Sequence, residues 1–255
     1  MSARMWGVLL VLSGAIFLEG IDVAMMGVAL PAIQDDLGMS TASLQWVVSA
    51  YVLGYGGFML LGGRAADLLG RRRMFLFWLG VFLVFSGLGG FADTGWVLIV
   101  SRFVTGLAAA FMTPAGLSII TTSFPEGAQR NKALLVYAGI AAAGFSLGLV
   151  VGGLLTAVHW RWVFFAPVAL AAVLLAAALR LLPREERPER TGGFDVAGAV
   201  AVTAAMLLLV TAVVRGPDVD PVWTVLTGAA GLLALGVFVA VERRSAAPLV
   251  RFGVL

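Results

Sequence analysis

The sequence has no cysteine and only one histidine, His159, among its 255 residues. It therefore holds no disulfide framework, no thiolate metal site and no histidine cluster, and we predict no bound metal. Charged residues are also scarce, at 12% of the chain against about 25% in soluble globular domains. With 61% hydrophobic residues and a mean hydropathy of +1.02, the chain cannot keep its apolar surface out of water. We predict an integral membrane protein.

Apolar runs of about twenty residues predict membrane-spanning helices. A backbone in lipid must satisfy its own hydrogen bonds, which leaves helices or closed barrels. Barrel strands would alternate polar and apolar residues over roughly ten positions, and this chain does not. Twenty residues in a helix cross a hydrocarbon core of ~30 Å. The predicted fold is all-α, with eight spans at about residues 5–30, 44–64, 74–92, 96–119, 132–157, 162–182, 194–214 and 222–241.

The placement of lysine and arginine predicts the orientation, because cytoplasmic loops carry an excess of both. With the N-terminus inside, 14 of the 17 basic residues fall on the cytoplasmic side. Only Arg161 and Arg215 fall outside, and Arg102 lies within a span. We therefore expect a multi-pass protein of the plasma membrane with both termini in the cytoplasm. The basic pI of about 9.9 then reflects topology rather than a nucleic-acid partner.

The longest polar stretch, Pro183 to Gly193, divides the spans into two groups. We predict a six-helix bundle in residues 1–182 and a cytoplasmic linker in residues 183–193. Residues 194–255 then form two extra helices and a cytoplasmic tail. The first six spans hold every buried charge, so function is expected there. The interiors of the last two contain no ionisable residue and are expected to be plain lipid-facing helices.

Three charged residues lie deep within the spans, away from their ends, where a charge costs about 2.5–3.5 kcal/mol on insertion scales. Glu19 and Asp22 are three residues apart and share one helix face. Asp22 lies roughly 13 Å below the outer end of its span and Arg102 roughly 9–10 Å below that of span 4, so we expect them to be neighbours. A carboxylate held between burial and a nearby cation can bind and release a proton at modest cost. The alternative is that each carboxyl is a neutral, hydrogen-bonded polar group.

The loop between spans 2 and 3 reads Gly63-Arg-Ala-Ala-Asp67-Leu-Leu-Gly70-Arg71-Arg72-Arg73. A positive inner loop with a glycine turn explains the arginines but not the aspartate. The pattern resembles the signature loop of the major facilitator superfamily, G-x-x-x-D-x-x-G-R-[RK]-[RK]. The resemblance implies that this loop, which we name the gating loop, locks two transporter halves together on the inner side. Its implied gating residues are Gly63, Asp67, Gly70, Arg71, Arg72 and Arg73.

Three further segments resemble the fourteen-helix drug:proton antiporter branch of this superfamily. They are Asp22 with the later ending Ala-Leu-Pro31, the run Arg102-Phe-Val-Thr-Gly106, and the glycine motif Gly144-x-x-x-Gly148-Leu149-x-x-Gly152-Gly153. Threonine and leucine replace the family's glutamine in the second and its proline in the third. Alone, the glycine motif indicates close helix packing. The resemblance favours an exporter over an importer of the same fold.

Two groups of side chains near the buried charges have two equally good interpretations. Tyr51, Tyr55 and Phe58 fall on one face of span 2, and Met25 and Met26 follow Asp22 in span 1. Each group fits core packing. Each also fits a wall that lines a substrate site, since methionine adapts to varied ligands.

The resemblance implies a secondary active transporter that exports hydrophobic or cationic small molecules, such as drugs or antibiotics, in exchange for protons. Its two halves would rock against each other. Asp22 and Glu19 would carry protons or contact the substrate, and Arg102 would tune them. The proton is the coupling ion, and no other cofactor is implied. No nucleophile–base pair or nucleotide loop indicates an enzyme.

A complete member of the branch has a second six-helix half, which the sequence does not contain. We expect this half as a partner, supplied either as a C-terminal half or as a second copy of the chain. The glycines from Gly144 to Gly153 are expected to form a surface that meets it. The alternatives are a half-size transporter working as a homodimer and a non-transporting membrane scaffold, which would not need the buried charges.

Overall fold

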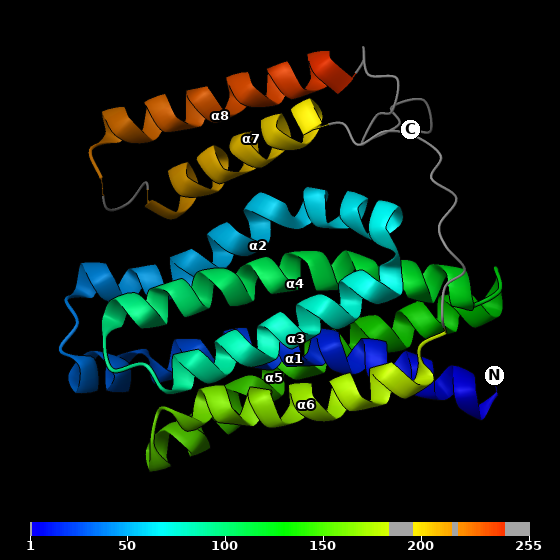
Figure 1. Ribbon diagram of the computed structural model, residues 1–255. Coiled ribbons are helices and arrows are strands. Elements are labelled where there is room, and N and C mark those ends of the chain that lie inside the picture. Colours follow the sequence, from blue (N-terminus) through cyan, green and yellow to red (C-terminus); the bar gives the residue numbers. More distant parts are fainter. Residues whose placement is uncertain (1, 184–195, 216–218, 243–255) are drawn as a thin grey trace.

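The computed structural model describes residues 2–183, 196–215 and 219–242, which form eight helices (Figure 1). They are α1 (Ala3–Leu37), α2 (Thr41–Leu69), α3 (Arg71–Gly90), α4 (Gly95–Ser123), α5 (Ala128–Val158), α6 (Trp162–Leu181), α7 (Val196–Arg215) and α8 (Pro221–Glu242). Each overlaps one predicted span. The predicted linker after Pro183 and the tail after Glu242, with their arginines, lie outside the described residues.

Seven of the described helices are long and apolar enough to cross a membrane. The exception is α7, whose apolar part within the described residues is Gly198–Val214. Its length is at the lower end of the range for a spanning helix, about 17 residues. The prediction of eight helices is therefore confirmed, and the spanning length is met by all but α7.

The first helix extends beyond its apolar run. We predicted an end near residue 30, but α1 continues through Pro31 to Leu37. The length of an apolar run predicts only the part of a helix that lies in lipid. The helix can continue beyond it until a residue caps its end. That signal is Gly38, which takes the left-handed conformation at φ 60° and donates its N–H to the carbonyl of Gln34. At the other end, the Ser2 hydroxyl accepts a hydrogen bond from the backbone N–H of Met5 at 3.3 Å.

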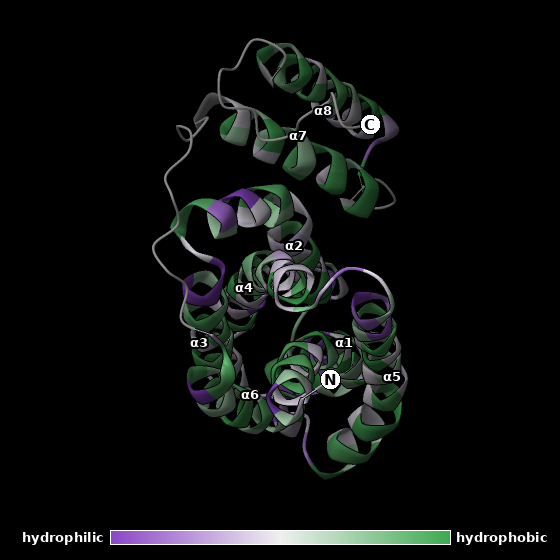
Figure 2. Cartoon of the chain, turned by 90° about the vertical axis from the view of Figure 1, so that its right-hand side faces the viewer, coloured by the Kyte–Doolittle hydropathy of each residue, from purple (hydrophilic) through white to green (hydrophobic). Residues whose placement is uncertain are grey.

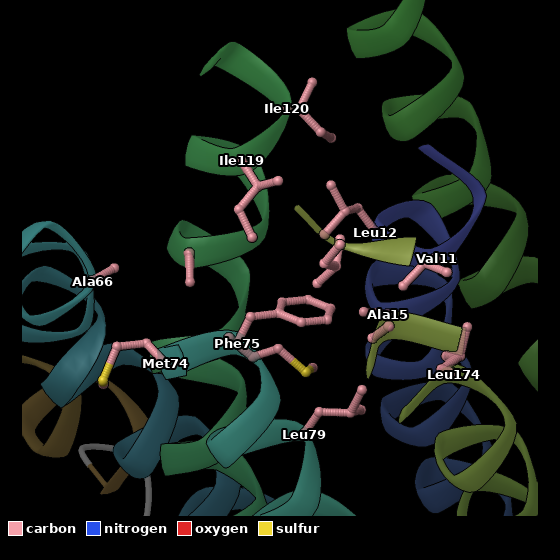
Figure 3. Packing of buried hydrophobic residues seen from close by; sticks show 14 of the residues in the cluster. Val11, Leu12, Ala15, Ala66, Met74, Phe75, Leu79, Ile119, Ile120 and Leu174 are labelled. Atoms are coloured by element: carbon pink, nitrogen blue, oxygen red, sulfur yellow. The ribbon is translucent and has the colours of Figure 1, made fainter. Parts of the chain in front are cut away.

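The first six helices form one bundle, seen end-on in Figure 2. In it α1 packs on α5 and α6, α2 packs on α4, and α3 packs on α4 and α6. The main core lies where α1, α3 and α4 meet. There the ring of Phe75 lies among Leu12, Ala15 and Ile119, as Figure 3 shows. In lipid, such close packing holds helices together, because lipid tails are as apolar as the side chains.

Large apolar side chains are exposed on the outside of the bundle, as expected for lipid contact, and its helices consist mainly of hydrophobic residues (Figure 2). Helix α5 shows this most clearly, since Leu135, Val150, Leu154 and Val158 are each more than half exposed. A soluble protein would not present such a continuous apolar face to water. The exposed side of α5 therefore faces lipid or another membrane helix.

The last two helices pack on each other, and α7 also packs on α2 (Figure 1). The side chain of Leu207 lies over Gly57, and Val210 lies near Gly56. Val202 and Ala205 of α7 are fully buried. The expectation of plain lipid-facing helices was therefore wrong for α7. The two glycines of α2 leave room for larger side chains, and an all-apolar helix gives no periodic signal for the side that fills this room.

Candidate functional site: a buried ion pair between α1 and α4

Asp22 of α1 and Arg102 of α4 form an ion pair inside the bundle. Arg102 Nη1 donates to Asp22 Oδ2 at 2.5 Å, and the two side chains are 1% and 2% exposed. The predicted proximity is confirmed. Each charge makes the other tolerable here, because an unpaired charge at this depth would be strongly destabilising.

Tyr51 of α2 covers this ion pair. The Arg102 guanidinium lies over the Tyr51 ring, 4.5 Å from its centroid, and Tyr51 stacks on Tyr55 with centroids 6.1 Å apart. Such a cation–aromatic contact is stronger in a desolvated site than at a surface. The approach depends on Gly106, since any Cβ there would collide with the Tyr51 backbone. Gly106, four residues after Arg102, therefore allows α2 to pack closely against α4.

Three polar atoms around the ion pair have no hydrogen-bond partner among the described residues. They are Asp22 Oδ1, Arg102 Nε and the Tyr51 hydroxyl, all buried. Buried polar groups are nearly always hydrogen-bonded, and each exception needs an explanation. The three atoms come from three helices, α1, α4 and α2. The site therefore has one acceptor, one donor and one hydroxyl that the ion pair does not use.

Glu19 lies one turn from Asp22 on α1 but has different partners. The Thr113 hydroxyl of α4 lies 2.6 and 2.7 Å from its two carboxyl oxygens. Glu19 is 6% exposed and forms no ion pair with any described base. Sequence reasoning missed Thr113. The available signal was its spacing of eleven residues, about three turns, from Arg102, which places both on one face of α4.

The gating loop joins three helices, α2, α3 and α6, at one end of the bundle. Gly70, at φ 96°, ends α2 and precedes α3. Asp67 accepts from Arg71 at 3.2 Å, whereas Arg72 donates to the carbonyls of Leu179 and Leu182 at the end of α6. Those carbonyls have no helical N–H partner, so the arginine caps α6.

The remaining gating residues, Arg73 and Gly63, take no part in these hydrogen bonds. Arg73 is exposed. Gly63 and Asp67 line a pocket of about 320 Å³ between α2, α4, α7 and α8. The gating loop thus borders the α7–α8 pair.

The glycine motif of α5 faces α1. A Cβ on Gly144, Gly148 or Gly152 would lie within about 3 Å of α1 backbone or side-chain atoms, whereas one on Gly153 would meet nothing within 4 Å. The first three glycines are buried and Gly153 is not. The expectation that Gly144 to Gly153 form a surface for a second half was therefore wrong. The spacing of four residues aligns three of them along one stripe, and α1 of the same chain occupies it.

The other candidate lining residues are packed in the bundle. Met25 and Met26 are fully buried in a second core cluster, and Met25 contacts Gly152. Phe58 packs edge-on against Phe103 with centroids 6.3 Å apart. Of the five residues, Tyr51 contacts the Arg102 guanidinium, and Tyr55 stacks on Tyr51.

A second polar cluster ties the helices together at the end of the bundle opposite the gating loop. Arg161, between α5 and α6, donates to the carbonyls of Gly90 and Ala92 at 3.0 and 2.7 Å. It also pairs with Asp93 at 3.3 Å and Asp36 at 3.6 Å. Sequence reasoning treated Arg161 only as an outside charge. Its planar guanidinium carries five N–H donors in a fixed geometry and can bridge several acceptors at once.

Comparison with known families gives a match to the Major Facilitator Superfamily over residues 12–247. The puromycin resistance protein pur8 of Streptomyces alboniger is 40% identical over 99% of this chain and 50% of that protein. The cephamycin export protein CmcT of Amycolatopsis lactamdurans is 40% identical over 91% of this chain and 48% of that protein. The chain thus spans about half the length of the relatives it matches.

Two solved structures have the same fold. The proton:xylose symporter XylE has a TM-score of 0.62 and 17% identity, over 84% of this chain and 52% of that one. The human organic anion transporter MFSD10 has a TM-score of 0.60 and 16% identity, over 82% and 55%. At such low identity these matches concern the fold alone.

Proposed function

Because this chain belongs to the major facilitator superfamily, we propose that it is the N-terminal half of a proton-coupled exporter of hydrophobic or cationic small molecules. The buried pair of Asp22 and Arg102 carries the proposal, together with the nearby Glu19. The names of its relatives, a puromycin resistance protein and a cephamycin export protein, support export of antibiotic-like molecules. Ionisable groups this deep in a membrane protein mark ion or substrate pathways.

The ion pair suits proton exchange for a physical reason. When Asp22 is charged, Arg102 neutralises it across 2.5 Å, so the site is stable while deprotonated. When Asp22 takes a proton, the attraction ends and Arg102 can turn to another acceptor. We propose that this change in partner couples proton binding to movement of α1 against α4. The unpartnered Tyr51 hydroxyl and Arg102 Nε are polar atoms available for the alternative arrangement.

Export by this fold requires two six-helix halves that tilt against each other around a central site. We propose that the chain works with a second half and that, as a monomer, it does not couple protons to export. The expected result for the 255-residue chain in liposomes with an imposed proton gradient is no movement of a fluorescent cationic dye. Adding a second half should restore movement, and Asp22→Asn should abolish it again. Proton-driven transport by a demonstrably monomeric chain would contradict the requirement.

We also propose a plasma-membrane protein with its N-terminus in the cytoplasm, because eight of the ten basic residues within residues 2–183 lie at the same end of the bundle as the N-terminus. Reporter fusions after Glu126, between α4 and α5, are expected to read cytoplasmic. Fusions after Asp93, between α3 and α4, are expected to read external. The reverse pattern would refute the orientation, and equal signals from both fusions would refute a single topology.

A further inference from the structure

We propose that the pocket between α2, α4, α7 and α8 binds one phospholipid, with an acyl chain among its apolar side chains and an anionic headgroup at its mouth. The pocket has a volume of about 320 Å³, within the range of small-molecule sites. Its apolar lining comes from four helices, as Met59 and Leu60 of α2, Pro114 of α4, Val202 of α7 and Phe238 of α8. The inference does not depend on the proposed export.

The pocket exists because α7 diverges from α2 along its length. At Gly56 the two helices are in contact, since a Cβ there would lie 3.2 Å from the side chain of Val210 of α7. Gly63 lies on the same face of α2, about two turns further along. Among the described residues, a Cβ on Gly63 would meet only Pro114 of α4, at 3.7 Å, and nothing of α7 within 4 Å. The space between α2 and α7 is therefore closed at Gly56 and opens toward the gating loop.

The depth of the pocket matches that of one lipid leaflet. Met59 lies ten residues and Asp67 two residues before the end of α2, so the pocket extends from about 15 Å to about 3 Å from that end. Half of a ~30 Å hydrocarbon core is about 15 Å thick. Met59 and Leu60 are also 38% and 45% exposed, so the pocket is open to the surrounding lipid. Its apolar side chains therefore lie at the depth of acyl chains.

The shape of the pocket favours a lipid over a helix of a second transporter half. A helix with its side chains is about 10–12 Å across and needs a groove that runs through the membrane. This groove is closed at Gly56, in the middle of α2, by contact with α7. Its occupant must therefore end inside the membrane, as an acyl chain does.

The charges at the mouth of the pocket favour an anionic headgroup. Arg64 and Asp67 line the pocket, and Asp67 pairs with Arg71 at 3.2 Å. Two arginines and one aspartate leave a net charge of +1. Basic residues at a membrane surface attract anionic lipids, and an arginine can pack its aliphatic stem against apolar groups while its guanidinium reaches the phosphate level. Phosphatidylglycerol therefore fits this mouth better than the zwitterionic phosphatidylcholine.

Photocrosslinking locates the acyl chain on the native chain, without any substitution. The 255-residue chain in detergent micelles receives phosphatidylglycerol that carries a diazirine at the end of one acyl chain. After irradiation, mass spectrometry identifies the labelled peptides. We expect labels at Met59 or Leu60 of α2 and near Val202 or Phe238 of α7 and α8, and we expect unlabelled phosphatidylglycerol to compete. Labels spread evenly over exposed apolar positions such as Leu154 of α5, or no labels, would overturn the site.

Filling the pocket should displace the lipid. Gly63→Leu adds a side chain where a Cβ makes only ordinary contact, and Leu60→Trp enlarges a half-exposed wall residue. Each should lower the amount of phosphatidylglycerol retained per chain several-fold in native mass spectrometry. The control, Val84→Trp, enlarges an exposed apolar residue of α3 and should leave retention unchanged. The site is wrong if both filled variants retain as much lipid as the control.

The headgroup is tested by charge. Arg64→Gln should reduce the preference for phosphatidylglycerol over phosphatidylcholine about fivefold. The control, Arg180→Gln, removes the same charge at the same end of the bundle and should change the preference less than about twofold. Equal retention of both lipids by the native chain would overturn the anionic headgroup. Retention of a fluorescent cationic dye in place of lipid, with loss in Gly63→Leu, would assign the pocket to a substrate and overturn the proposal. Lipid binding requires no transport, so a failure of the proposed export leaves the test intact.

Discussion

Replacing Arg102 with alanine is expected to lower the free energy of unfolding by about 3–5 kcal/mol, because it leaves Asp22 charged and unpaired inside the bundle. Both side chains are almost completely buried, so neither water nor a lipid headgroup can replace Arg102 as the partner of Asp22. Reversible unfolding in mixed micelles measures the change. The control is Arg180→Ala on the exposed side of α6, which should change stability by less than about 0.5 kcal/mol.

A second comparison separates the stability of the pair from its proposed role. The double variant Asp22→Leu with Arg102→Met replaces both charges by apolar side chains, and should recover much of the stability lost in Arg102→Ala. It should nevertheless remain inactive in export when combined with a second half. If the double variant exports as the native chain does, the pair is only structural. If Arg102→Ala is as stable as the native chain, the pairing itself is wrong.

Replacing Gly148 with alanine is the second change with a large expected effect. The new Cβ would lie 2.7 Å from the Ala24 Cβ and 2.9 Å from Ile21 backbone atoms. Backbone cannot move aside as a flexible side chain can, so α5 must shift away from α1. Overpacking of this kind costs about 1–3 kcal/mol, which should appear as a lower free energy of unfolding in the same micelles.

Gly153 provides a matched control in the same motif. A Cβ there meets nothing within 4 Å. Gly153→Ala should therefore be neutral, or gain up to about 1 kcal/mol from the better helix propensity of alanine. Equal losses in the two variants would show that helix flexibility, and not contact with α1, explains the glycines. The comparison thus tests the corrected orientation of the motif.

The depth of a residue in the membrane could be worked out from the sequence alone. A helix rises 1.5 Å per residue, so counting from the end of an apolar run gives one coordinate with little ambiguity. This is why the eight helices and the neighbourhood of Asp22 and Arg102 were predicted correctly. The family, too, could be identified from the gating loop, because its pattern of glycine, aspartate and arginine is more specific than a positive loop requires.

Lateral neighbours were decided only by the tertiary structure. An apolar helix in lipid has no polar face to mark its outer side, so its sequence does not tell which partner each face meets. The stripe from Gly144 to Gly152 therefore indicated close packing but not that α1 is its partner. For the same reason α7 was expected in lipid, although it packs on α2 through Leu207.

Side-chain partners across helices also depend on this lateral arrangement. Glu19 and Asp22 share one face of α1, and the sequence makes them equivalent carboxylates. Only the position of α4 beside that face gives Asp22 an arginine and Glu19 a threonine. The distinction between a carboxyl paired with a cation and one hydrogen-bonded to a hydroxyl therefore arises from how two helices meet, a lateral coordinate that neither composition nor rise per residue contains.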